Sequence, residues 1–335
     1  MKIVRHALST RPSTGSGRTQ TPPAVRPELV EGRTEIAIAI GSFDGVHLGH
    51  QAILARVVAE ARARALSPAV LTFEPLPREF FSPATAPARL TSLSERLAQI
   101  ACMDIAVAFV ERFDARFAAL SPGAFAQRLR DAYRARWVMV GPDFRYGAKR
   151  AGDIAMLEAA GRELGFEVAV LSEVDDHGAR VSSTRVREAL ARADFAGAAR
   201  LLGRPYRITG RVMHGAKRGR ALGFPTANVR LARAKPPLTG IFAVRCYGAA
   251  TRGLEGVASL GLNPAVNRGG PATLEAFLFD FSGDLYGRHL SIEFLVKLRD
   301  EAHFASLDAL AAQIQRDCER AREFFKSQHQ SRAME

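Results

Sequence analysis

The chain has 335 residues, enough for two domains that each bury a hydrophobic core. Apolar residues make up 47% of it and charged residues 24%, which is typical of a soluble globular protein and unlike a disordered one. No apolar run approaches the roughly 20 residues needed to cross a bilayer, and no apolar signal segment follows the N-terminus. We therefore expect a cytoplasmic protein.

The formal net charge of +13 indicates an anionic partner. The arginines are spread along the chain, and no helix-turn-helix, zinc-finger or RNP signature accompanies them, so a nucleotide is favoured over nucleic acid. The three cysteines, Cys102, Cys246 and Cys318, form no Cys-x-x-Cys pair. This usage argues against a structural zinc site and for a reducing compartment.

The chain begins with a segment that shows no periodicity. Residues 10–34 are rich in Pro, Thr, Ser, Gly and Arg, so we expect residues 1–34 to be flexible and 26–33 to be an insertion without a catalytic role. The β-branched run Ile36–Ile40 then predicts a strand buried on both faces. Gly41 and Asp44-Gly45 end it, and a helical period starts at Leu48, with one face formed by Leu54, Val57, Val58, Ala61 and Ala65.

A strand, a glycine turn and a helix form the opening of a nucleotide-binding βαβ unit, whose helix N-terminus attracts phosphate. His47 and His50 stand three residues apart at that terminus. His47 lies between Gly45 and Gly49, and His50 directly follows Gly49. An imidazole can donate a hydrogen bond to a phosphoryl oxygen and partly neutralise it. Two other interpretations stay open: histidines without a task, and a metal pair, for which a His-x-x-His pattern alone is weak evidence.

Strands and helices then alternate as far as residue 193. The sequence predicts strands over 69–73, 105–109, 137–140 and 167–171, and helices over 91–102, 122–134, 154–164 and 184–193. This order predicts a parallel, doubly wound sheet, which binds ligands beyond the carboxyl ends of its strands. The side chains expected there are His47, Glu74, Asp143 and Ser182.

The pattern changes after Pro205. Short alternating runs at 206–212, 241–247, 256–260, 274–281 and 290–298 are separated by glycine turns and predict a small antiparallel barrel. A last helix over 307–325 has apolar residues on one face at Leu310, Ile314, Cys318 and Ala321.

Three stretches of the first half resemble the nucleotidyltransferase domain of prokaryotic FAD synthetases: 41–50, 141–147 and 181–187. The last is similar to that family's Ser-Ser-Thr-x-x-Arg motif, in which Thr184 and Arg187 face one side of a helix and can hold a phosphate together. The resemblance implies catalytic roles for His47, His50 and Arg187. It implies nucleotide binding by Gly41, Phe43, Asp44, Gly45, Gly49, Asp143, Ser183 and Thr184.

Residues 210–228 resemble the ATP- and Mg²⁺-binding segment of riboflavin kinases, and they contain no Walker A motif. The resemblance implies that Thr226 and Asn228 ligate Mg²⁺, since hydroxyl and amide oxygens suit this ion. By ordinary turn chemistry, the stretch from Pro225 to Asn228 alone would be a turn. The residues implied to bind ATP are Gly215, Lys217, Arg218, Gly223 and Pro225.

Residues 273–281 resemble the kinase strand that carries a catalytic Glu, here Glu275. Attack of a hydroxyl on the γ-phosphorus of ATP requires a base, and strand alternation separates Glu275 from the apolar face of Leu274, Ala276 and Leu278. The other interpretation is an exposed strand residue. Two departures would weaken binding or slow phosphorylation: residues 261–265 lack the family's Arg and Thr, and Phe277 replaces a His.

Together these motifs resemble bifunctional riboflavin kinase/FAD synthetase. The resemblance implies a Rossmann-like nucleotidyltransferase domain over 35–200, a riboflavin kinase barrel with a terminal helix over 205–326, and a tail over 327–335. Its substrates would be riboflavin, FMN and ATP with Mg²⁺, and neither nucleic acid nor membrane is expected as a partner. The alternatives are an FAD synthetase with an inactive kinase half, a nucleotidyltransferase for another substrate, and a basic nucleic-acid- or flavin-binding protein.

Overall fold

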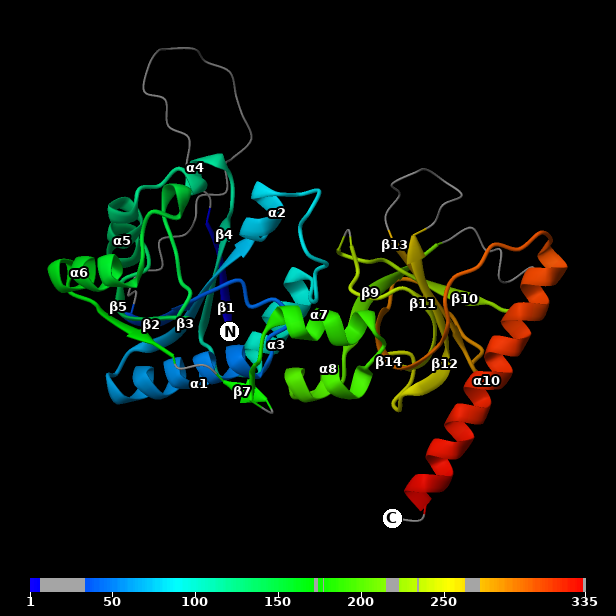
Figure 1. Cartoon of the computed structure of the whole chain (residues 1–335). Helices are drawn as coiled ribbons and strands as arrows, with labels where there is room; N and C mark the ends of the chain where they lie inside the picture. The colour runs from blue at the N-terminus through cyan, green and yellow to red at the C-terminus, as the bar shows by residue number, and fades with distance from the viewer. Residues whose placement is uncertain are drawn as a thin grey trace, which may run out of the picture. The chain divides into compact units, whose positions relative to one another are not determined.

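The computed structural model describes residues 1–6, 34–171, 174–176, 178–214, 223–233, 235–262 and 272–333 (Figure 1). The chain divides into two compact units. The first comprises Met1–Phe43, Gly49–Ala86 and Leu97–Val174, and the second comprises Asp44–Leu48, Pro87–Arg96 and Asp175–Glu335. Within the described residues, no helix is both long and apolar enough to cross a membrane.

The first unit is built on a six-stranded sheet in the order β1-β4-β3-β2-β5-β6, and every pairing is parallel. This confirms the predicted parallel α/β fold. The strand at one edge, β1, comes from the N-terminal segment, which the sequence predicts to be flexible and without a strand. Residues 7–33, which include the proposed insertion, lie outside the described residues. The strands are β1 Lys2–His6, β2 Ile36–Ile40, β3 Ser67–Glu74, β4 Val107–Arg112, β5 Ala135–Val140 and β6 Glu167–Val170.

Helices cover this sheet because its central strand is apolar on both faces. All five residues of β2 are buried, and Ile36, Ile38 and Ile40 pack in one cluster with Leu129 of α5 and Leu157 of α6. The helices are α1 Leu48–Ala63, α2 Pro77–Phe81, α3 Leu93–Ala101, α4 Ala115–Ala118, α5 Pro122–Asp131 and α6 Ile154–Leu164. The 3₁₀ turn η1 Ala148–Arg150 lies between β5 and α6.

Helix α1 differs from its prediction at one position. It buries Leu54, Val57, Val58 and Ala61 as expected, but it ends at Ala63. Ala65 is exposed and has φ +54°, so the chain has already left the helix there and Ala65 cannot share the apolar face.

The second unit contains a closed antiparallel barrel in the order β10-β13-β12-β11-β14-β9, which confirms the predicted barrel. Its strands are β9 Arg207–Met213, β10 Thr226–Val229, β11 Gly240–Tyr247, β12 Leu254–Leu262, β13 Ala272–Leu278 and β14 His289–Arg299. The unit also holds the short pair β7 Asp175–Asp176 and β8 Ala179–Arg180, with helices α7 Ser183–Ala191, α8 Phe195–Leu202 and α10 Leu307–Ala333.

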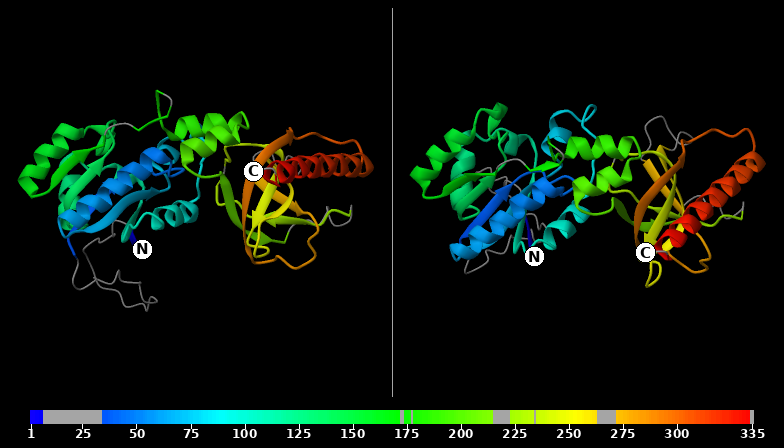
Figure 2. Two further views of the ribbon diagram at one scale, coloured as in Figure 1. Left: turned by 90° about the horizontal axis from the view of Figure 1, so that it is seen from below. Right: turned by 60° about the horizontal axis from the view of Figure 1, so that its bottom comes forward.

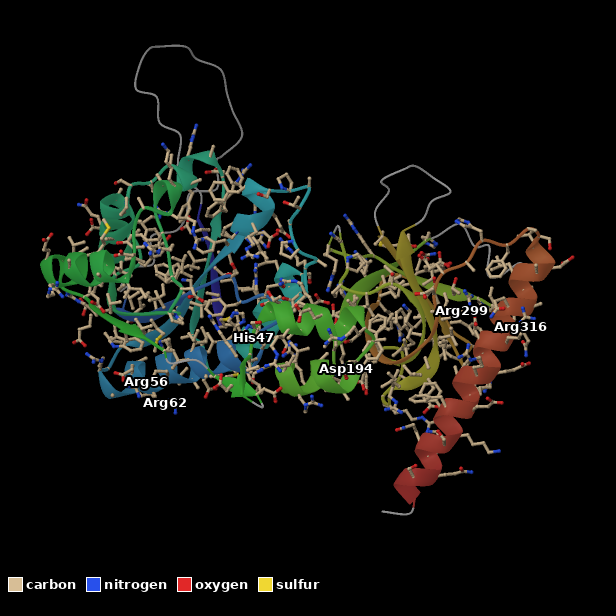
Figure 3. The ribbon with its side chains drawn as sticks, viewed as in Figure 1. His47, Arg56, Arg62, Asp194, Arg299 and Arg316 are labelled. Atoms are coloured by element: carbon tan, nitrogen blue, oxygen red, sulfur yellow. The ribbon has the colours of Figure 1, made fainter. Side chains whose placement is uncertain are left out.

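The predicted terminal helix is present as α10, and it runs past Phe325 to Ala333. Figure 2 shows it along the outside of the barrel, where Cys318, Ala321 and Phe325 pack against Ile241 and Ala243 of β11. Arg299, labelled in Figure 3, lies at the end of β14. Its guanidinium forms an ion pair of 2.7 Å with Asp317 of α10. Arg322 and His329 of α10 also contact Asp280 and Glu255, so an apolar stripe and several polar pairs attach the helix to the barrel.

Candidate active sites

Residues Asp44–Leu48, which we call the histidine loop, belong to the second unit. The Asp44 carboxylate is 3% exposed and accepts hydrogen bonds from the backbone N–H groups of Leu90 (3.1 Å) and Thr91 (2.9 Å). The Gly45 N–H donates to Thr91 Oγ1 at 3.0 Å. Gly45 has φ +86°, and a Cβ there would lie 2.7 Å from Leu90 Cδ1, so glycine is required.

Helix α7 approaches the same loop. The Ser183 hydroxyl donates to the Asp44 carbonyl oxygen at 2.8 Å, and Arg187 Nη2 lies 2.5 Å from Asp44 Oδ2. Arg187 Nε donates to the Ala88 carbonyl oxygen at 2.5 Å, and Thr184 is exposed. The structure thus brings Ser183, Arg187 and Asp44 together, whereas the joint hold of Thr184 and Arg187 on a phosphate stays a prediction.

His47 lies at the N-terminal end of α1 and is 6% exposed (Figure 3). Burial lowers its pKa to about 4, although the nearby Asp44 carboxylate opposes this shift. The ring is therefore neutral at pH 7. It can donate a hydrogen bond to a phosphate oxygen, but it brings no full positive charge.

The other nucleotide-binding candidates of the first half belong to the first unit. Phe43 is fully buried with φ +49°, and its ring packs edge-on against His50 with centroids 5.3 Å apart. Gly49 and His50 form the first turn of α1. Gly41 follows β2, and the exposed Asp143 follows β5, so both lie at the carboxyl edge of the sheet, as predicted for Asp143.

The kinase candidates meet on two paired strands of the barrel. Asn228 of β10 is directly opposite Glu275 of β13, and Thr226 lies two residues before Asn228 on the same face. The Thr226 hydroxyl donates to Glu275 Oε2 at 3.4 Å. Ala227 and the other alternate residues face the core, so the predicted alternation is confirmed. Residues 226–228 form a strand and not a turn, because β10 pairs with both β13 and β9.

The surroundings of Glu275 are partly aromatic. The Phe277 ring packs edge-on against Phe224 with centroids 5.5 Å apart, beside the α10 cluster. Gly223 has φ +83°, and Pro225 directly precedes the first residue of β10. Gly215, Lys217 and Arg218 lie outside the described residues. So do residues 263–271, which include part of the 261–265 stretch that lacks the family's Arg and Thr.

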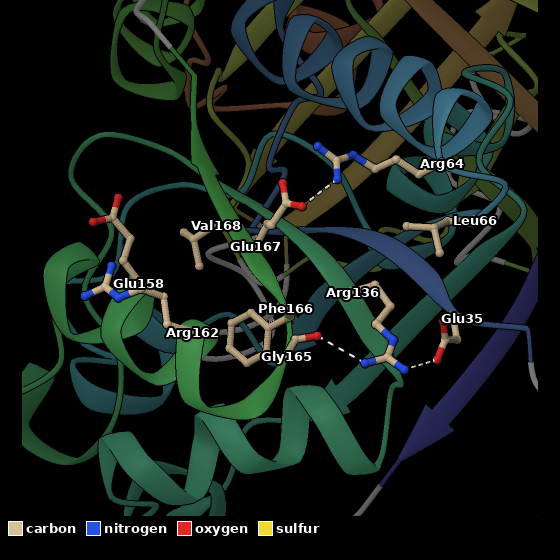
Figure 4. A pocket seen from close by; sticks show the side chains of 11 residues that line it. Glu35, Arg64, Leu66, Arg136, Glu158, Arg162, Gly165, Phe166, Glu167 and Val168 are labelled. Carbon is tan, nitrogen blue, oxygen red and sulfur yellow. Dashed lines mark hydrogen bonds and ion pairs between the residues drawn. The ribbon is translucent and has the colours of Figure 1, made fainter.

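A surface pocket of about 760 Å³ lies elsewhere in the first unit (Figure 4). Four of its charged side chains form two ion pairs: Arg136 with Glu35 at 2.5 Å and Arg64 with Glu167 at 2.8 Å. Glu35 precedes β2 and Glu167 begins β6, so the pocket opens at the amino edge of the sheet. It contains none of the predicted site residues.

Among the residues that the structure describes, no group of three or more His, Cys, Asp or Glu side chains is arranged to hold a metal.

The first half has a parallel α/β sheet, and the second half has a barrel with Thr226, Asn228 and Glu275 on one face. This is the architecture of a protein with a nucleotide site in each half. The FAD synthetase family model matches residues 30–185, and the riboflavin kinase model matches 202–325. The chain is 46% identical to the bifunctional riboflavin kinase/FMN adenylyltransferase of Escherichia coli strain K12 over 289 residues, which cover 86% of this chain and 92% of the relative.

The enzyme of the same name from Pseudomonas fluorescens is 48% identical over 284 residues, which cover 84% of this chain and 91% of the relative. A solved structure described as a macrolide-efflux protein from Streptococcus pneumoniae has a TM-score of 0.68 and 29% identity, covering 84% of this chain and 92% of that one. The chain therefore belongs to the family of bifunctional riboflavin kinases/FMN adenylyltransferases.

Proposed function

We propose that the protein makes FMN from riboflavin and ATP, and then FAD from FMN and a second ATP with release of pyrophosphate. Residues 205–326 would perform the first reaction and 35–200 the second. The observation that carries the proposal is the meeting of Thr226, Asn228 and Glu275 on one face of β10 and β13, in a chain that also contains the histidine loop.

For the kinase reaction, Glu275 would accept the proton of the ribityl 5′-hydroxyl as that oxygen attacks the γ-phosphorus of ATP. Thr226 and Asn228 offer a hydroxyl and an amide oxygen beside this carboxylate, a donor set that fits Mg²⁺. When bound, Mg²⁺ would neutralise charge on the phosphates. The strand pairing holds the base and the two oxygen donors in a rigid arrangement.

For adenylyl transfer, the attacking group is the phosphate of FMN, which is already anionic and needs no strong base. The barrier is the crowding of negative charge at the α-phosphorus, which positioned donors relieve. We assign this role to the neutral His47 ring, to His50, and to the Thr184 hydroxyl with Arg187. In this assignment Asp44 and Ser183 shape the loop, because their contacts are with α7 and with Leu90 and Thr91.

The purified protein, incubated with riboflavin, ATP and Mg²⁺, should produce FMN and then FAD, separated by chromatography. Chelation of Mg²⁺ should stop both steps. If neither flavin product forms, the proposal is wrong.

A second candidate is an FAD synthetase with an inactive kinase half. The sequence resemblance implies a His at the position of Phe277, whose ring instead packs against Phe224, and this favours the second candidate. Conversion of supplied FMN to FAD, with riboflavin left unchanged, would support this candidate over the bifunctional enzyme.

A further inference from the structure

The backbone of the histidine loop is held by an arginine from the other half of the chain. Arg204 lies between α8 and β9, within the residues that the riboflavin kinase model matches. Its Nη2 donates to the Gly45 carbonyl oxygen at 2.7 Å, and its Nη1 donates to the Val46 carbonyl oxygen at 3.1 Å. Nη1 also donates to the Leu202 carbonyl oxygen at 3.0 Å, which fixes the guanidinium to the end of α8.

The two carbonyls that Arg204 binds belong to residues in an uncommon conformation. Gly45 has φ +86° and Val46 has φ +41°, and Val46 is 1% exposed. A β-branched residue at positive φ is strained and persists only where its surroundings enforce it. The planar fork of a guanidinium matches two successive carbonyl oxygens, and charge-assisted hydrogen bonds are the strong ones. Arg204 therefore holds the backbone immediately before His47.

A second arginine of the barrel half is connected to the loop through Leu90. Arg233 is 5% exposed and donates to the Leu90 carbonyl oxygen at 2.6 Å, and it also pairs with the Glu95 carboxylate. The N–H group of the same Leu90 donates to Asp44. Glu95 in turn accepts from the Thr209 N–H of β9 at 2.6 Å. The loop is thus attached to residues 202–325 along two separate routes.

We infer that Arg204 is a positioning residue for FMN adenylyl transfer, although it lies in the half of the chain assigned to the kinase reaction. This inference rests on the proposed function of the histidine loop. Arg204 acts through the backbone of Gly45 and Val46, which sets where the His47 ring points. A misplacement of such a group by about 1 Å can cost about 100-fold in rate.

The test compares Arg204→Met with Arg207→Met in the full-length protein. Arg207 is the matched control, because it lies three residues away on β9 and pairs with Glu293 of the barrel at 2.6 Å. For each variant, kcat and KM are measured for FAD formation from FMN and, separately, for FMN formation from riboflavin. Hydrogen exchange of the peptide that contains residues 44–48 is measured without substrate.

We expect Arg204→Met to lower kcat/KM for FAD formation by about 10- to 100-fold and to speed exchange in residues 44–48, with FMN formation unchanged. Arg207→Met should leave FAD formation unchanged. An Arg204→Met protein within twofold of wild type in FAD formation, or one that loses both reactions equally, would overturn the inference.

If Arg204→Met does not fold, Arg204→Lys decides the question, because lysine keeps the charge but lacks the fork. A selective loss of FAD formation in that variant supports the positioning role, and wild-type rates for both reactions overturn it. A wild-type protein that makes no FAD from FMN would refute the proposed function instead, which separates the two failures.

Discussion

Arg187 Nη2 lies 2.5 Å from Asp44 Oδ2, and the two residues are 143 positions apart in the sequence. The pair joins α7 to the histidine loop, and Asp44 also accepts from the N–H groups of Leu90 and Thr91. We predict that Asp44→Asn lowers the free energy of unfolding by about 3 kcal/mol, because it leaves Arg187 without its counter-ion. An asparagine amide would also face N–H donors with its own NH₂ group.

Urea unfolding of Asp44→Asn, Arg187→Met and the double variant measures this coupling. The double variant should lose clearly less than the sum of the single losses, by at least about 1 kcal/mol, as expected for contacting residues. If the loss in the double variant equals the sum of the two single losses, a direct interaction between Asp44 and Arg187 is contradicted.

Glu275→Gln should lower the rate of FMN formation by about 100- to 10,000-fold, because a glutamine amide cannot accept the hydroxyl proton. FAD formation from supplied FMN should be unchanged. Glu255→Gln is the matched control, since Glu255 lies on the neighbouring strand β12 and pairs with Arg245 at 3.5 Å. Equal loss in both variants would show that barrel stability, and not the base, was removed.

Replacing both His47 and His50 by alanine should have the reverse effect. FAD formation should fall by at least about 100-fold, because both proposed phosphate donors are removed, while FMN formation continues. The same product assay with riboflavin and ATP measures both rates in one experiment. Continued conversion of FMN to FAD at the wild-type rate would exclude the histidines from the reaction.

The pKa of His47 should be measurable near 4, because burial disfavours the charged ring. The unfolded chain then binds the proton more readily than the folded chain between pH 6.5 and pH 4. Consequently the free energy of unfolding should fall as the pH drops through that window. NMR titration of the ring gives the pKa directly. The His47→Asn variant should show a shallower fall, and an identical pH dependence would contradict the assignment.

The three thiols should differ sharply in reactivity. Burial raises the pKa of Cys246 to about 12 and that of Cys318 to about 11, whereas Cys102 is exposed. Since the thiolate is the reactive form, a thiol reagent at pH 8 should label one cysteine per native chain rapidly and all three after denaturation. Cys102→Ser should remove the fast phase, and fast labelling that persists in this variant would contradict the burial.

The residues alone predict both architectures and most of the longer helices and strands, although not β1, β10 or α8. The apolar run of β2, the helical spacing of α1 and the alternation around Glu275 are local patterns, and they record which side of an element is buried. The glycine and histidine motif likewise predicts a phosphate site, and that site stays a prediction.

Tertiary structure decided which side chains meet. The stretch 226–228 would be a turn by its local chemistry, and only pairing with β9 and β13 makes it a strand that places Asn228 opposite Glu275. The contacts of Arg204 with Gly45 and Val46 span more than 150 positions and have no sequence signature. Periodicity encodes the face of one element, whereas such contacts and the burial of His47 depend on how distant elements pack.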